Sequence, residues 1–155
     1  MISTRDFTTG TTMASAASPP DPRAPMLAVL PGTPESVRAA RQLARELLGV
    51  EHPAIETTML LISELVTNSV RHSRSGEPGG RVTVVLCAGP AGILIQVSDD
   101  GGPSEPCVSA ISADDAEHGY GLLLVDALAE RWGSICSPEG RVTWCRVSGN
   151  GVTKV

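Results

Sequence analysis

The stretch from Leu60 to His72 constrains the fold of this chain most, because it contains neither glycine nor proline and is typical of an α-helix. At about 100° per residue, apolar side chains recur along one stripe of that helix. The stripe consists of Ile55, Met59, Ile62, Val66 and Val70. Because such a stripe must face a core, we expect one amphipathic helix, opening at Pro53 and ending near Ser73, to organise the fold.

Two polar residues of this helix, Glu64 and Asn68, are four positions apart and therefore lie one above the other. They stand away from the apolar stripe, with Leu61 and Leu65 on one flank. A carboxylate and an amide beside apolar residues suggest the wall of a pocket. Two solvated polar residues on an amphipathic helix give the same pattern, and this stretch alone favours that simpler interpretation.

The composition suits one domain with a single core. The chain has 155 residues, of which 41% are hydrophobic and only 3% aromatic, so the core must be aliphatic. The net charge of −5 argues against a nucleic-acid-binding protein. No direct contact with nucleic acid is therefore expected.

The cysteines and the hydropathy pattern bear on the compartment. Cys87, Cys107, Cys136 and Cys145 include no CxxC pair, which argues against a zinc site. No signal-peptide pattern is present, and no apolar stretch approaches the roughly 20 residues that a membrane-spanning helix needs. We expect a cytoplasmic protein with reduced thiols and no membrane contact.

Residues 1–23 are rich in Ser, Thr, Ala and Pro and predict a disordered leader, while residues 149–155 predict a frayed tail. The folded domain is expected over residues 24–148. Within it, Thr33 is predicted as the N-cap of the first helix, which runs to Leu48 and ends at Gly49. The other predicted elements are an edge strand over 26–30, the central helix, strands over 81–87 and 93–99, a helix over 122–131, and strands over 132–137 and 141–147.

This order, with strands paired as hairpins and helices between the pairs, indicates an α+β fold. The expected form is a two-layer sandwich in which helices cover one face of a mixed, mostly antiparallel sheet. Arg38, Arg41 and Arg45 form a basic ridge on the first helix. A solvated face is the usual meaning of such a ridge, and a docking surface for an acidic partner is the alternative.

Asp99, Asp100 and Gly101 follow directly after an apolar strand. By the period of two, Asp99 shares a face with Ile93, Ile95 and Val97, so it points toward the helices. A carboxylate in that position needs a hydrogen-bonding partner or a ligand. The alternative is an ordinary turn residue at the end of a strand.

Gly119 and Gly121 precede another helix. Backbone amides and the helix dipole at such a position can hold a phosphate group. A plain joint between loop and helix would give the same pattern. The segment before it, residues 101–118, has no regular pattern, and a loop of that length inside a compact domain is usually functional or mobile.

Together and in this order, the three motifs resemble those of the GHKL superfamily of ATPases and kinases, which includes gyrase, Hsp90, histidine kinases and MutL. Residues 64–72 resemble its N box, residues 99–101 its first glycine box and residues 117–122 its second. The likeness is strongest to the small bacterial serine/threonine kinases that act as anti-sigma factors. It covers roughly residues 26–148, nearly all of the expected domain.

The resemblance implies a Bergerat-type ATP-binding fold, with ATP between the helices and a lid over residues 101–118. It implies that Glu64 is the general base on the attacking hydroxyl, Asn68 holds Mg²⁺, and Asp99 accepts from the adenine amino group. The further nucleotide-binding positions that it implies are Arg71, His72, Gly101, Gly119, Tyr120, Gly121 and Leu122. His72 is equally well explained as a structural hydrogen-bond donor. Because a carboxylate cannot donate to a carbonyl, such a site should prefer ATP to GTP.

The function implied is that of a serine/threonine protein kinase that phosphorylates an anti-anti-sigma protein of the STAS type and sequesters a sigma factor, acting as a homodimer. A nucleotide-gated module that binds a sigma factor without turnover is the alternative. One departure from the family pattern bears on the lid. The first glycine box continues as Gly102-Pro103, and Pro103 removes a backbone donor.

Overall fold

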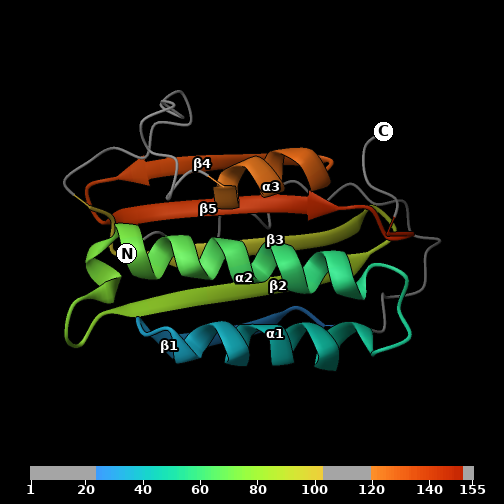
Figure 1. Ribbon diagram of the computed structural model, residues 1–155, viewed down its shortest axis with the longest axis horizontal. Helices are drawn as coiled ribbons and strands as arrows, with labels where there is room; N and C mark the ends of the chain where they lie inside the picture. The colour runs from blue at the N-terminus through green and yellow to red at the C-terminus, as the bar shows by residue number, and fades with distance from the viewer. Residues whose placement is uncertain (1–23, 103–119, 152–155) are drawn as a thin grey trace, which may run out of the picture.

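The computed structural model describes residues 24–102 and 120–151 (Figure 1). The predicted leader over 1–23 and most of the predicted loop over 101–118 therefore lie outside the described residues. In chain order the elements are β1 (Met26–Pro31), α1 (Glu35–Leu48), α2 (Ile55–His72), the 3₁₀ turn η1 (Arg74–Gly76), β2 (Arg81–Gly89), β3 (Gly92–Asp99), α3 (Tyr120–Leu128), β4 (Arg131–Ser137) and β5 (Gly140–Val147).

The strands form one sheet in the order β1-β2-β3-β5-β4. Both predicted hairpins are present, and β3 joins them by pairing with β5. All three helices lie on one face of the sheet (Figure 1). The predicted α+β sandwich is thus confirmed. The prediction of a mixed, mostly antiparallel sheet is right in its main part, but each pairing in the described sheet is antiparallel, because β2–β3 and β4–β5 are hairpins and β1 and β5 also run opposite to the strands β2 and β3 that they join.

The predicted central helix is α2, which lies between α1 and α3 over the middle of the sheet (Figure 1). Four members of its predicted stripe are buried, from Ile55 to Val66, and Val70 is partly buried. The buried face is wider than one stripe, because α2 has a helix on each side. Leu61 and Leu65, predicted to flank the polar pair, are also buried.

The core between sheet and helices is aliphatic, as the low aromatic content predicts. Its largest fully buried side chains are all leucine, isoleucine or valine. On β3 the inward positions are Ile93, Ile95 and Val97, at 1%, 0% and 0% exposure. Burying each such side chain contributes about 1.5–3 kcal/mol, so the inward face of β3 strongly fixes the strand's register.

Two predicted helix ends need correction. The structure places Pro34 at the cap position of α1 and gives no side-chain capping bond, so Thr33 is not the N-cap. The last helix ends at Leu128 rather than at Arg131, because Arg131 already pairs with Arg146 across the β4–β5 hairpin. Gly49 does end α1, with φ +82° and its N–H donating to the Arg45 carbonyl at 2.8 Å.

The face of the sheet away from the helices carries exposed apolar side chains, including Leu27, Val29 and Ile135. On the helix-covered side Cys145 is buried, and burial raises the pKa of its thiol to about 12. Cys87, Cys136 and Cys145 form no disulfide bonds. None of the helices in the described ranges is long and apolar enough to cross a membrane.

Candidate functional site

Glu64 and Asn68 lie on the flank of α2 that faces α3, one turn apart, and both are half-buried. Their position follows from the helix repeat, which places them next to Leu61 and Leu65 rather than on the outer surface. Among residues 24–102 and 120–151, neither side chain makes a hydrogen bond or an ion pair. A carboxylate and an amide are therefore held at the seam between two helices with their polar atoms unused.

The contact between this flank and α3 is close. A Cβ atom added at Gly121 would lie 2.7 Å from Oε2 of Glu64 and 3.8 Å from its Cδ. Only a glycine lets the first turn of α3 come this near to the carboxylate. The structure thus brings together Glu64 of the first motif and Gly121 of the third, although they are far apart in the sequence.

Asp99 ends β3 on the helix-covered face, as the period of two predicts, and its side chain is buried. Asp100 is exposed, so the two neighbouring acids point in opposite directions. The carboxylate of Asp99 accepts from the Gly101 N–H through Oδ1 at 2.9 Å. Its second oxygen, Oδ2, accepts from two nitrogens of Arg141, Nε at 3.1 Å and Nη2 at 2.8 Å.

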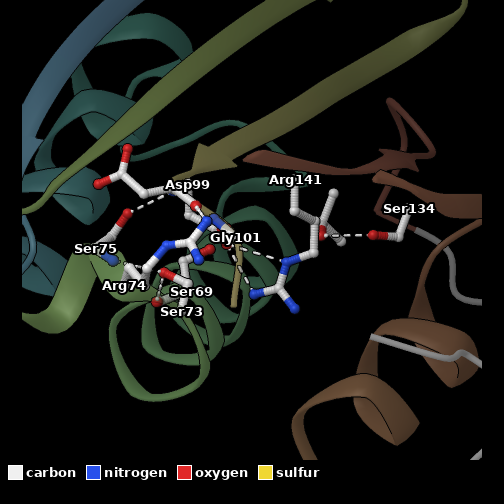
Figure 2. A network of polar contacts seen from close by, with 10 residues as sticks. Ser69, Ser73, Arg74, Ser75, Asp99, Gly101, Ser134 and Arg141 are labelled. Atoms are coloured by element: carbon white, nitrogen blue, oxygen red, sulfur yellow. Dashed lines mark hydrogen bonds and ion pairs between the residues drawn. The ribbon is translucent and has the colours of Figure 1, made fainter. Parts of the chain in front are cut away.

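The segment around Asp99 is tied to the turn that follows α2 (Figure 2). The Asp100 N–H donates to the Ser75 hydroxyl at 2.8 Å, and the Gly101 carbonyl accepts from the Arg74 N–H at 2.6 Å. The Arg74 guanidinium also donates to the Asp100 carbonyl at 3.0 Å. The second motif is thereby held in a fixed relation to the turn that follows the first motif.

Gly101 adopts φ +71°, a conformation that favours glycine, and this turns its N–H back toward the Asp99 carboxylate. Gly102 packs beside the end of α2, since a Cβ there would lie 3.1 Å from the His72 carbonyl oxygen. Arg71 and His72 are exposed on the last turn of α2. At the second motif the chain therefore leaves the sheet directly beside the end of α2.

The third motif is described only in part. Gly119 lies outside the described residues, Tyr120 begins α3, and Leu122 is half-buried on it. The structure thus brings Glu64 and Gly121 together at the α2–α3 seam, with Asn68 one turn further along α2, and it brings Asp99 and Gly101 together at the end of β3. Arg71 and His72 lie on the last turn of α2, where Gly102 packs beside His72.

The described residues contain no group of three or more His, Cys, Asp or Glu that could hold a metal ion. A hard cation at this site would need oxygen ligands from its substrate in addition to the protein. Mg²⁺ is commonly bound in this way, by one or two protein oxygens together with phosphates and water. The unused amide of Asn68 fits that requirement, and so does the unused carboxylate of Glu64.

Sequence reasoning missed Arg141, Arg74 and Ser75. For Arg141 a signal was available, because period-two parity along β5 places it on the same face as Thr143, Cys145 and Val147. A charged residue on an inward face needs an opposite charge, and Asp99 was the predicted inward carboxylate. Each contact of Arg74 and Ser75 with Asp100 or Gly101 has a backbone group on at least one side, so it leaves no sequence pattern.

Residues 30–147 match the family described as the histidine kinase-like ATPase domain. The chain belongs to this family. The match spans most of the chain and includes every motif of the candidate site, so the GHKL resemblance inferred from the sequence is confirmed.

Individual relatives within the family carry the name serine-protein kinase RsbW. The one from Listeria monocytogenes serotype 4a is 31% identical over 120 residues, covering 65% of this chain and 73% of the relative. The one from Listeria innocua serovar 6a has the same identity and coverage. A third, from Listeria monocytogenes serovar 1/2a, is 35% identical over 75 residues, covering 46% of this chain and 48% of the relative.

Proposed function

We propose that this histidine kinase-like ATPase domain is an ATP-dependent serine/threonine protein kinase that regulates a sigma factor. The observation that carries the proposal is the pair Glu64 and Asn68, which is half-buried and has no partner among the described residues, with Glu64 directly beside Gly121 in the first turn of α3. A pure binding module has no need of an unpaired carboxylate at this seam. The names of the RsbW relatives support the same class of activity.

In this proposal the two parts of the site bind the two ends of ATP. Asp99, buried and oriented by Gly101 and Arg141, accepts from the base. The seam between α2 and α3 receives the phosphates, near Gly119, Tyr120, Gly121 and Leu122, with Arg71 and His72 at the end of α2. Asn68 supplies one oxygen ligand to Mg²⁺, which when bound neutralises phosphate charge.

The chemical step assigned to this chain is the removal of one proton. Glu64 takes the proton from a serine or threonine hydroxyl as its oxygen forms a bond to the γ-phosphorus, and the bond from that phosphorus to the ADP oxygen breaks. ADP leaves and the protonated Glu64 returns its proton to water. The half-buried position of Glu64 suits this role, because the carboxylate lies at the seam and no residue in the described part of the chain holds it.

The phospho-acceptor proposed is a small anti-anti-sigma protein of the STAS type, and the sequestered partner is a sigma factor. The exposed ridge that includes Arg38 and Arg41 supplies a positive surface for an acidic partner. The exposed apolar side chains on the uncovered face of the sheet support a homodimer, because such patches often mark protein contacts. A nucleotide-gated module without turnover remains the second candidate, and phosphotransfer separates the two.

Thermal unfolding with and without Mg²⁺-ATP tests the nucleotide site. At ligand concentrations about 100 times Kd, binding should raise the free energy of unfolding by about 2.7 kcal/mol. Asn68→Ala should lose the part of this gain that depends on Mg²⁺, whereas Thr67→Ala, its neighbour on another side of α2, should keep it. An unfolding curve that saturating Mg²⁺-ATP leaves unchanged would refute the nucleotide site altogether.

Transfer of labelled γ-phosphate tests the kinase activity. The chain would be incubated with Mg²⁺-ATP and STAS-type proteins recovered together with it from cell extract, and the labelled residue would be located by mass spectrometry. The proposal expects label on one serine or threonine of the partner. Nucleotide-dependent binding of the partner without any label would select the binding module instead.

A further inference from the structure

The contact between Asp99 and Arg141 alters what a base would meet at the buried end of β3. The two residues face each other in the β3–β5 register, and 42 positions of sequence separate them. The side chain of Asp99 is 0% exposed and that of Arg141 is 5% exposed. The carboxylate is therefore one half of a buried ion pair, and it is not the lone acceptor that the sequence suggested.

The geometry of the pair leaves Asp99 little freedom. An ionised carboxylate offers about four lone-pair positions. Oδ2 accepts two N–H groups from Arg141 and Oδ1 accepts one from Gly101. The remaining acceptor position of Asp99 is thus on Oδ1, and its direction is fixed by three hydrogen bonds before any ligand arrives.

Arg141 places a guanidinium directly beside the Asp99 carboxylate. A guanidinium has five N–H groups and no acceptor, and the contacts with Asp99 use two of them. The buried end of β3 therefore offers both an acceptor and a donor. Adenine presents an amino donor beside the acceptor N1, whereas guanine presents a carbonyl acceptor beside the donor N1–H. A pair that contains both kinds of group can satisfy either edge.

A second observation is found on the facing helix. The hydroxyl of Ser69 is buried and has no hydrogen-bond partner among the described residues. Ser69 lies on the buried side of α2, one turn before Ser73, whose hydroxyl donates to the Ser69 carbonyl at 2.6 Å (Figure 2). An orphaned hydroxyl at this end of α2 leaves one polar atom for a further group to satisfy.

We propose that Arg141 is a specificity-determining residue that acts with Asp99 as one base-reading pair, and that the pair accepts guanine as well as adenine. The inference rests on the proposed nucleotide site. A lone buried carboxylate would reject guanine, because the carbonyl oxygen would face an acceptor and leave it unpaired. The guanidinium removes that penalty by supplying a donor. The strong preference for ATP expected from Asp99 alone is therefore replaced by a weak one.

Titration calorimetry with Mg²⁺-ATP and Mg²⁺-GTP tests the inference. The wild-type protein should bind the two nucleotides with dissociation constants within about tenfold of each other. Arg141→Met removes every donor of this side chain. The ratio of the dissociation constant for GTP to that for ATP should then rise by about 10- to 100-fold, the size expected for one lost hydrogen bond to a charged group. Arg141→Lys keeps a charged donor next to Asp99 and should retain a ratio close to the wild-type value.

Arg146→Met is the matched control, because Arg146 lies on the same strand but is exposed and pairs with Leu94 on the uncovered face. It should leave the ratio unchanged. If Arg141→Met fails to fold, the wild-type ratio still decides, since rejection of GTP by about 10⁴-fold or more is the behaviour of a site built on one acceptor. That rejection, or an equal ratio in wild type and Arg141→Met, would overturn the inference while leaving the nucleotide site intact. Failure of both nucleotides to bind the wild-type protein would overturn the site as well.

Discussion

Two carboxylates of the candidate site, Asp99 and Glu64, are held in opposite ways. Asp99 is buried, and its oxygens accept three N–H groups, one from Gly101 and two from Arg141. Glu64 is half-buried beside Gly121, and no described residue binds it. Both acids come from the motifs of one family, yet the protein fixes the first completely and leaves the second unpaired.

The contrast separates recognition from chemistry. A group that recognises a ligand gains from being oriented beforehand, because no ordering cost remains at binding. A general base must instead be able to accept a proton, and hydrogen bonds to its charged form would hinder that. The difference between Asp99 and Glu64 therefore predicts different consequences when each is changed.

The largest expected effect is on turnover, from Glu64→Gln. Removal of a general base typically lowers the rate by about 10²- to 10⁴-fold. Because no described residue binds Glu64, the free energy of unfolding and the affinity for Mg²⁺-ATP should change little. Phosphotransfer rate, urea unfolding and calorimetry would be measured on the same preparation. Glu56→Gln, an exposed acid in the first turn of α2, is the control. Equal rates in wild type and Glu64→Gln would remove Glu64 from the chemistry.

The next effect is on stability, from Asp99→Ala. It leaves the buried guanidinium of Arg141 without a counter-charge, which typically costs about 3–5 kcal/mol of unfolding free energy. Asp100→Ala should change that free energy by less than about 0.5 kcal/mol, because its side chain is exposed and its hydrogen bonds come from the backbone. Urea unfolding of both variants measures the difference. Similar losses of unfolding free energy in the two variants would show that the ion pair with Arg141 does not hold Asp99 in place.

The smallest effect is expected from Gly121→Ala, and it should separate rate from stability. The new Cβ would meet Oε2 of Glu64 at 2.7 Å, so the carboxylate must move away. We expect about a 10- to 100-fold loss of phosphotransfer from this displacement. Stability should stay the same or rise by up to about 1 kcal/mol, because alanine favours helix more than glycine does. Gly149→Ala, where an added Cβ would have no contact closer than 3.8 Å, is the control. Unchanged phosphotransfer would mean that the position of Glu64 is not critical.

The features that sequence predicted well are those with a local repeat. The apolar stripe from Ile55 to Val66 fixes α2, and alternation along Ile93, Ile95 and Val97 fixes the inward direction of Asp99. Each depends on neighbours two to four positions away. The family resemblance implied roles for Glu64 and Asn68, and these roles stay predictions; periodicity alone could not distinguish the pair from a solvated face.

What the sequence could not give was the meeting of distant segments. The Asp99–Arg141 pair depends on the register of β3 against β5, which is set by the packing of both strands under α2 and by no local pattern. The end of α3 at Leu128 was also missed, since Ala129 and Glu130 are good helix formers and the β4–β5 pairing overrides that preference.

The β3–β5 seam has a consequence for how this protein can change over evolutionary time. Asp99 and Arg141 take their positions from the β3–β5 register, so the stretch of chain that connects β3 to α3 is not needed to align these two residues. The entropy of closing a loop grows only slowly with its length, by about 0.6 kcal/mol for each doubling. A change in the length of that stretch should therefore cost little free energy, while the sheet preserves the geometry of the Asp99–Arg141 pair.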